Sequence, residues 1–216
     1  MRVLGVDPGL TRCGLGVIEG APGRALVLRH VEVLTTVSSV ALPERLLLIS
    51  RGIEGLISAT SPDIVVIERM FSQHNLHSVM GTAQASAVAV LAAANAGLPV
   101  AWHTPTEVKA AVTGTGRADK AQVAGMVVRI LRLERAPKPV DATDALALAI
   151  CHVWRGSASD RIADAVAAAP PARIPRRSKG GATSGPGSAA AGTAQRTAAS
   201  STSRAAGVSV RIGGPR

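Results

Sequence analysis

Two short apolar segments limit what this chain can fold into more than any other feature of its sequence. Residues 2–7 are nearly all apolar up to Asp7 and stop at Pro8-Gly9, and residues 64–67 are four consecutive β-favouring residues. Strands without a polar face are buried on both sides, which requires a sheet with helices on each face. The chain is therefore predicted to be an α/β protein with buried central strands.

The remaining pattern predicts a mixed sheet. Turn residues separate further strands at about 13–18 and 25–34, so the first three strands form an antiparallel meander. Apolar spacing then predicts, in chain order, helices and one more strand. The helices are expected at about 43–60, 75–96, 105–112, 119–133 and 141–154, and the strand at 98–102. This alternation is typical of a mixed α/β sheet covered on both faces.

The composition divides the chain near residue 156. Residues 1–156 carry 15 Lys and Arg and 12 Asp and Glu, net +3, whereas residues 157–216 carry 9 and 2, net +7. The second segment is rich in Ala, Ser, Gly, Pro, Thr and Arg and cannot bury enough apolar surface to fold. We expect one domain over 1–156 and a basic, low-complexity, disordered tail over 157–216, with a short helix near 160–169. Any nucleic-acid surface on the mildly basic domain must be a local patch.

The location of the protein is predicted from segments that the sequence lacks. An acidic residue at position 7 interrupts any signal peptide, and no run of about 18 apolar residues could span a membrane. Cys13 and Cys151 lie in apolar surroundings without metal-binding spacing, as expected of buried thiols in a reducing compartment. We expect a cytoplasmic protein with no membrane contact.

Four carboxylates lie at the ends of buried elements. Asp7 and Glu68 each end a buried strand, where ligands bind in open α/β sheets. Asp141 and Asp144 begin a helix that continues over residues 145–151 without a polar side chain. Helix capping alone could explain two acids at a helix start. Their spacing of three, however, places both on a face that continues into the core.

Converging carboxylates require positive charge. Crowded acids repel one another, and their pKa values rise unless cations are present. A site with only oxygen ligands suits Mg²⁺ or Mn²⁺. Two such ions about 3.5 to 4 Å apart can activate water and stabilise the leaving oxygen of a phosphodiester. The pattern predicts a nuclease with two Mg²⁺ ions per subunit, which Mn²⁺ could replace.

Three segments of the chain resemble the motif blocks of the RuvC family of Holliday junction resolvases. They are Leu4 to Gly9 with Gly14 to Val17, Ile67 to Phe71, and Asp141 to Ala147. The resemblance runs to about residue 154. It implies a ribonuclease H-like fold with a five-stranded sheet, a homodimer, and Mg²⁺-dependent symmetrical nicking of four-way DNA junctions in recombination and repair. It also implies RuvA and RuvB as partners, and it assigns catalysis and metal binding to Asp7, Glu68, Asp141 and Asp144.

Further residues could hold DNA. Phe71, the only Phe, follows Glu68 in a polar loop, where it could stack on an unpaired base or fill the core. The family resemblance favours stacking. Lys109 and Lys120 flank a glycine-rich turn, and the resemblance places phosphate-binding lysines there. Arg69 and Arg117 are additional candidates for DNA binding.

The helix expected at 75–96 has an apolar surface wider than one stripe. Such a helix needs two partners, for which the sheet and a second subunit are one explanation and a position central to its own fold is the other.

Other functions remain open. The turn at residues 7–11 also resembles the phosphate-binding turn of the actin, hexokinase and Hsp70 ATPases, but these need two lobes that 156 residues cannot supply. A junction-binding protein without catalysis would have no use for four converging acids. Another ribonuclease H-like nuclease is the remaining alternative.

Overall fold

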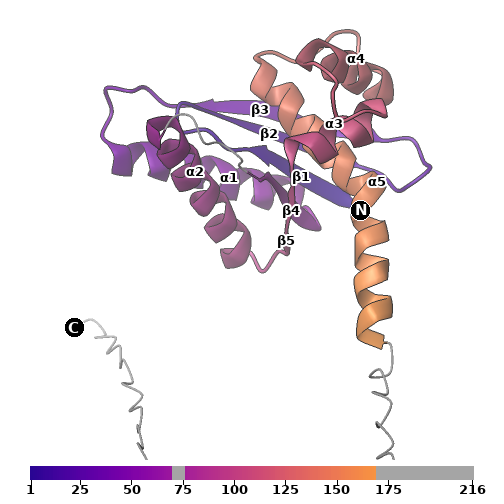
Figure 1. Ribbon diagram of the computed structural model, residues 1–216. Helices are drawn as coiled ribbons and strands as arrows, with labels where there is room; N and C mark the ends of the chain where they lie inside the picture. Colours follow the sequence, from indigo (N-terminus) through magenta and orange to yellow (C-terminus); the bar gives the residue numbers. More distant parts are fainter. Residues whose placement is uncertain (70–75, 169–216) are drawn as a thin grey trace, which may run out of the picture. The chain divides into compact units, whose positions relative to one another are not determined.

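The computed structural model describes residues 1–69 and 76–168 of the chain (Figure 1). Its elements, in order, are β1 (Arg2–Asp7), β2 (Arg12–Glu19), β3 (Val27–Thr35), α1 (Leu42–Thr60), β4 (Ile64–Glu68), α2 (Leu76–Asn95), β5 (Val100–His103), α3 (Pro105–Thr113), α4 (Lys120–Leu131) and α5 (Val140–Ala168). The predicted strands and the helices up to residue 133 are present with small differences at most ends, and the last helix differs from the prediction.

The five strands form one mixed sheet, as predicted, in the order β3-β2-β1-β4-β5. The pairs β1 with β2 and β2 with β3 are antiparallel, whereas β4 runs parallel to β1 and to β5. Val6 lies opposite Ile67 in the β1–β4 register, so the next residues, Asp7 and Glu68, end their strands side by side at the same end of the sheet.

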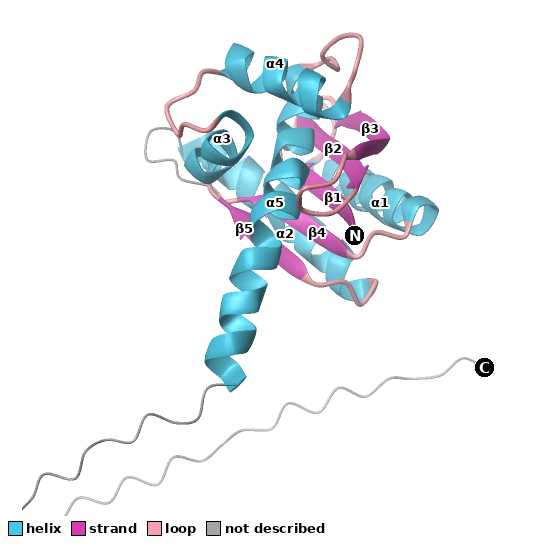
Figure 2. Ribbon diagram, turned by 90° about the vertical axis from the view of Figure 1, so that its right-hand side faces the viewer, coloured by secondary structure: helices cyan, strands magenta, loops and turns pink. Residues whose placement is uncertain are grey.

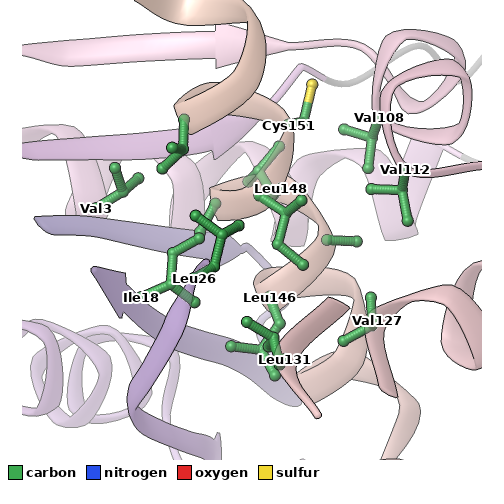
Figure 3. Close-up of a cluster of buried hydrophobic side chains, with 14 of the residues drawn as sticks. Val3, Ile18, Leu26, Val108, Val112, Val127, Leu131, Leu146, Leu148 and Cys151 are labelled. Carbon is green, nitrogen blue, oxygen red and sulfur yellow. The ribbon is translucent and has the colours of Figure 1, made fainter. Parts of the chain in front are cut away.

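Helices cover both faces of the sheet (Figure 2). The side chains of the strands alternate between the two faces. Leu4 faces a core formed with α1 and α2, where Ile49 and Ala89 are fully buried. Val3 faces the opposite core, which α3, α4 and α5 complete (Figure 3). Cys13 and Cys151 are buried in these two cores, as predicted.

Glycines let α5 lie directly on the sheet. A Cβ at Gly5 would overlap the carbonyl oxygen of Ala145, and one at Gly14 would overlap that of Asp141. Only hydrogen at these two positions leaves room for the helix backbone. The first turns of α5 therefore rest on β1 and β2, beside the end of β1 that carries Asp7.

The last helix is longer than the sequence pattern predicted. It was expected to end at Trp154, with a separate helix at 160–169, but one helix runs from Val140 to Ala168. Gly156 costs only about 1 kcal/mol in a helix and does not break it. A side chain at this position would also collide with the His152 ring. The predicted division at residue 156 thus falls within a helix, and 169–216 lie outside the described residues.

Within the described ranges, no helix combines the length and the apolar character that crossing a membrane would require.

The glycine contacts predict a large loss of stability for Gly5→Ala. The added methyl would meet backbone atoms of α5, which cannot move aside alone, so we expect a loss of roughly 2 to 4 kcal/mol in the free energy of unfolding. Gly55→Ala on α1 is the matched control, because no atom lies within 4 Å of its Cβ. That change should raise stability by about 0.5 to 1 kcal/mol. Urea unfolding measures both, and equal effects would contradict the packing argument.

Candidate active site

A pocket of about 300 Å³ opens where the acidic ends of the elements meet. Its charged lining consists of Asp7 from β1, Glu68 from β4, Asp144 from α5, Lys109 from α3 and Lys120 from α4. The other wall is largely apolar and is formed by Pro105, Val108, Val123, Ala147 and Leu148. Three of the four predicted acids and both predicted lysines therefore share one cavity, while their functional roles stay predictions.

Local structure fixes each of these side chains. The parallel pairing of β1 with β4 places Asp7 beside Glu68, and the close contact of α5 with β2 brings Asp144 to the same place. Lys120 opens α4 directly after Asp119, whose side chain caps the helix by accepting from the Gln122 N–H at 2.8 Å. Such a cap fixes the direction of the first turn.

The electrostatics of the pocket reflect the crowding of its acids. Burial raises the pKa of Asp7 to about 7, and the negative charges of Glu68, Asp144 and Asp141 add to this rise. Burial, followed by the charge of Asp144, also raises the pKa of Glu68. The lysines act in the opposite direction, since Lys120 lowers both pKa values and Lys109 lowers that of Glu68. The site therefore holds more negative charge than its lysines balance.

Asp141 does not line the pocket but lies close enough for its charge to act on Asp7. Its Oδ2 is 3.1 Å from Nε of Arg12, the first residue of β2. On the other side of the site, Nζ of Lys120 donates to Oδ2 of Asp144 at 2.9 Å. The two acids in the first turns of α5, Asp141 and Asp144, are thus each paired with a basic side chain.

Arg12 is a site residue that the sequence reasoning missed. It is the first residue of β2, directly after the turn that follows Asp7, and a basic residue at the start of an otherwise apolar strand was the available signal. The contact between Arg12 and Asp141, however, forms only because α5 packs on β2 in the folded protein.

The four acids form a set of oxygen donors beside the pocket. Over residues 1–69 and 76–168, no three Asp, Glu, His or Cys side chains stand together as one ligand set. Two of the acids, Asp141 and Asp144, are paired with basic side chains. The chemistry of the donors does fit: the four acids offer only oxygen, the ligand that hard divalent cations prefer. Burial, and then the neighbouring acids, raise the pKa of Asp7, so a cation at this place would favour its charged form.

The remaining predicted residues lie outside the pocket. Arg69 is exposed directly after Glu68, and its backbone N–H donates to the carbonyl of His103 at 2.8 Å. Arg117 is exposed in the turn before α4. Neither contributes to the pocket lining. Phe71 falls outside the described residues.

Comparison with known proteins identifies the family. The sequence model of a protein family described as crossover junction endodeoxyribonuclease RuvC matches residues 3–152. Proteins of that name from Streptomyces griseus and Thermobifida fusca are 62% and 61% identical to the chain, over 78% and 76% of its length and 82% and 91% of theirs. A structure described as T. thermophilus RuvC in complex with Holliday junction substrate has a TM-score of 0.71 at 34% identity, covering 74% of this chain and 96% of that one. The chain has the ribonuclease H-like fold of these structures and belongs to the RuvC family of crossover junction endodeoxyribonucleases.

Proposed function

We propose that the protein resolves Holliday junctions in recombination and repair, by symmetrical paired nicks in strands of a four-way DNA junction. One observation carries this proposal: three acids and two lysines of a RuvC-family chain converge in a single pocket. Acids suit metal-assisted phosphodiester hydrolysis, and lysines beside them suit a DNA phosphate. The substrate class follows from the family and from the relative solved with a Holliday junction.

Family membership implies dependence on a divalent metal ion. We propose two Mg²⁺ ions per subunit, replaceable by Mn²⁺, held by Asp7, Glu68, Asp141 and Asp144. When bound, such ions supply Lewis-acid activation of water and stabilisation of charge on the leaving oxygen. The all-oxygen donor set supports this assignment, as does the raised pKa of Asp7, which is caused by burial and then by the neighbouring acids.

The chain's own residues position the DNA around this centre. Lys109 and Lys120 line the pocket and can hold oxygens of the phosphate to be cut. Val108 and Leu148 form part of its apolar wall, which excludes water and strengthens electrostatic interactions inside. The exposed Arg69 and Arg117 are proposed to contact phosphates farther along the strand.

Phe71 follows Glu68 by three residues. By its resemblance to the family pattern, we propose that it stacks on a base of the junction.

A homodimer would place two such sites on one junction. The outer face of α2 is apolar: Met80 is 58% and Leu91 59% exposed, and Ala83 and Ala87 between them are also exposed. Its opposite face is buried on the sheet through residues such as Ala89. We propose that the exposed faces of two α2 helices pack together, so that twofold-related sites each cut one strand.

The proposal extends to partners and location. RuvA and RuvB, the branch-migration proteins named by the family resemblance, are the proposed partners at the junction. A chromosomal DNA substrate implies the cytoplasm as the place of action.

Asp7→Asn is expected to abolish cleavage while leaving junction binding intact. It removes one anionic ligand from the proposed metal site, so the cleavage rate should fall roughly 10³-fold or more. The measurement uses a labelled four-way junction, a plain duplex and an RNA–DNA hybrid with Mg²⁺. Glu54→Gln, an exposed acid on α1, is the control and should cut at the wild-type rate.

Two outcomes of this experiment would contradict the proposal. Unchanged cleavage by Asp7→Asn would remove Asp7 from the mechanism. Equal cutting of all three substrates by the wild-type protein would instead indicate a general ribonuclease H-like nuclease.

The raised pKa of Asp7 predicts a pH-dependent stability without divalent ions. In the folded protein this carboxyl titrates at about 7, against an ordinary value of 3.8, so the folded state binds a proton that the unfolded chain releases between these values. Stability should therefore fall as pH rises from about 4 to 7. Asp7→Asn has no charge to bury and should exceed the wild type at pH 8 by up to about 4 kcal/mol. Urea unfolding in EDTA at pH 5 and pH 8 measures the difference, and parallel pH profiles would contradict it.

Leu91→Glu should separate the proposed dimer into monomers. A carboxylate buried in an apolar interface would carry a desolvation cost, and the monomer avoids this cost because it leaves the carboxylate in solvent. Sedimentation measures the mass, and single instead of paired nicks are expected at the junction. Val27→Glu on β3, where the side chain is 46% exposed, is the control and should remain dimeric. A Leu91→Glu variant that stayed dimeric would place the interface elsewhere.

A further inference from the structure

Arg12 lies beside the acidic centre in an environment unlike that of the lysines. It opens β2, and its Nε is 3.1 Å from Oδ2 of Asp141. Its side chain is 58% exposed and that of Asp141 is 24% exposed. The guanidinium therefore combines contact with a proposed metal ligand and access to solvent.

The backbone at Arg12 is held firmly although its side chain is open. The buried Arg45 of α1 donates from Nη2 to the carbonyl of Leu10 at 3.2 Å and to Oγ1 of Thr11 at 3.1 Å. Thr36, also buried, donates its backbone N–H to the carbonyl of Thr11 at 3.0 Å. These bonds fix the turn that leads into β2. They therefore fix the backbone position of Arg12, while its side chain can change conformation.

The pair of Arg12 with Asp141 matches the pair of Lys120 with Asp144. Each acid of the first turns of α5 is neutralised by one basic side chain, from β2 on one side and α4 on the other. Pairs as exposed as these are weak, because water and salt screen them. A divalent cation, with twice the charge, can take the carboxylate from such a partner.

Given the proposed function, on which this inference rests, we propose that Arg12 is a positioning residue that exchanges one anion for another. It holds Asp141 until a divalent cation binds that carboxylate, and then its freed guanidinium binds a phosphate of the DNA strand at the site. Arginine suits the second role, since its planar fork of donors matches two phosphate oxygens.

The first test measures metal binding without DNA. Mn²⁺ is titrated calorimetrically into the full-length, metal-free protein. Arg12→Gln removes the competitor for Asp141, so Mn²⁺ should bind about two- to fivefold more tightly than to the wild type. Arg12→Lys keeps the charge and should bind Mn²⁺ nearly as the wild type does. The control is Arg24→Gln, an exposed arginine in the turn between β2 and β3, which should leave Mn²⁺ affinity unchanged.

The second test measures the DNA contact. With a four-way junction and saturating Mn²⁺, Arg12→Gln should raise KM and leave kcat nearly unchanged. The slope of log kcat/KM against log salt concentration should become shallower by about 1, as expected for the loss of one phosphate contact. Arg12→Lys should retain most of that salt dependence, and Arg24→Gln should behave as the wild type.

The outcomes separate this inference from the proposed function. Equal or weaker Mn²⁺ binding by Arg12→Gln would overturn the competition with Asp141, and an unchanged salt slope would overturn the phosphate contact. If the wild-type protein binds Mn²⁺ and cuts junctions, either of these two results overturns the role of Arg12 and leaves the proposed function intact. A wild type that neither binds Mn²⁺ nor cuts junctions defeats the proposed function itself.

Discussion

The contact between the backbone of α5 and the β1–β2 pair is the constraint on which the rest of the site depends. Hydrogen at Gly5 and Gly14 lets the helix approach the strands until main-chain atoms touch. Asp141 lies at that contact, and Asp144 follows one turn later. Three elements distant in sequence, β1, β4 and α5, therefore deliver carboxylates to one place. A larger side chain at either glycine would move the helix and separate its acids from Asp7.

The cost of this packing is electrostatic. Burial and neighbouring acids raise the pKa of Asp7 to about 7, so the folded metal-free protein holds a carboxyl in conflict with its surroundings. The fold relieves part of the conflict with its own cations, Lys120 at Asp144 and Arg12 at Asp141. The acids that remain unpaired would be stabilised by further positive charge, and a bound metal ion would supply it.

The sequence determined the parts of this architecture that follow from local pattern. The apolar runs predicted β1 and β4. They also predicted that Asp7 and Glu68 lie at the carboxyl ends of these neighbouring strands. Features set by tertiary packing were missed: α5 continues past Gly156, and Arg12 meets Asp141 only because the helix lies on β2. The convergence of the acids was expected, but sequence could not show that Asp141 stays outside the pocket lining while Asp144 enters it.

The pairing of acids with internal cations also explains how a DNA strand can approach a cluster of carboxylates. Most of the net charge of +10 lies after residue 156, and residues 1–156 carry only +3, so attraction by the domain as a whole is weak. A polyanion instead meets local positive charge at Lys109, Lys120 and Arg12, all beside the acids. Two of these cations are bound to carboxylates, so under the proposal a metal ion that takes Asp141 would free Arg12 for a phosphate. Under this proposal, metal binding and DNA binding would reinforce each other through the same side chain, as thermodynamic linkage requires of two ligands that remove a shared competitor.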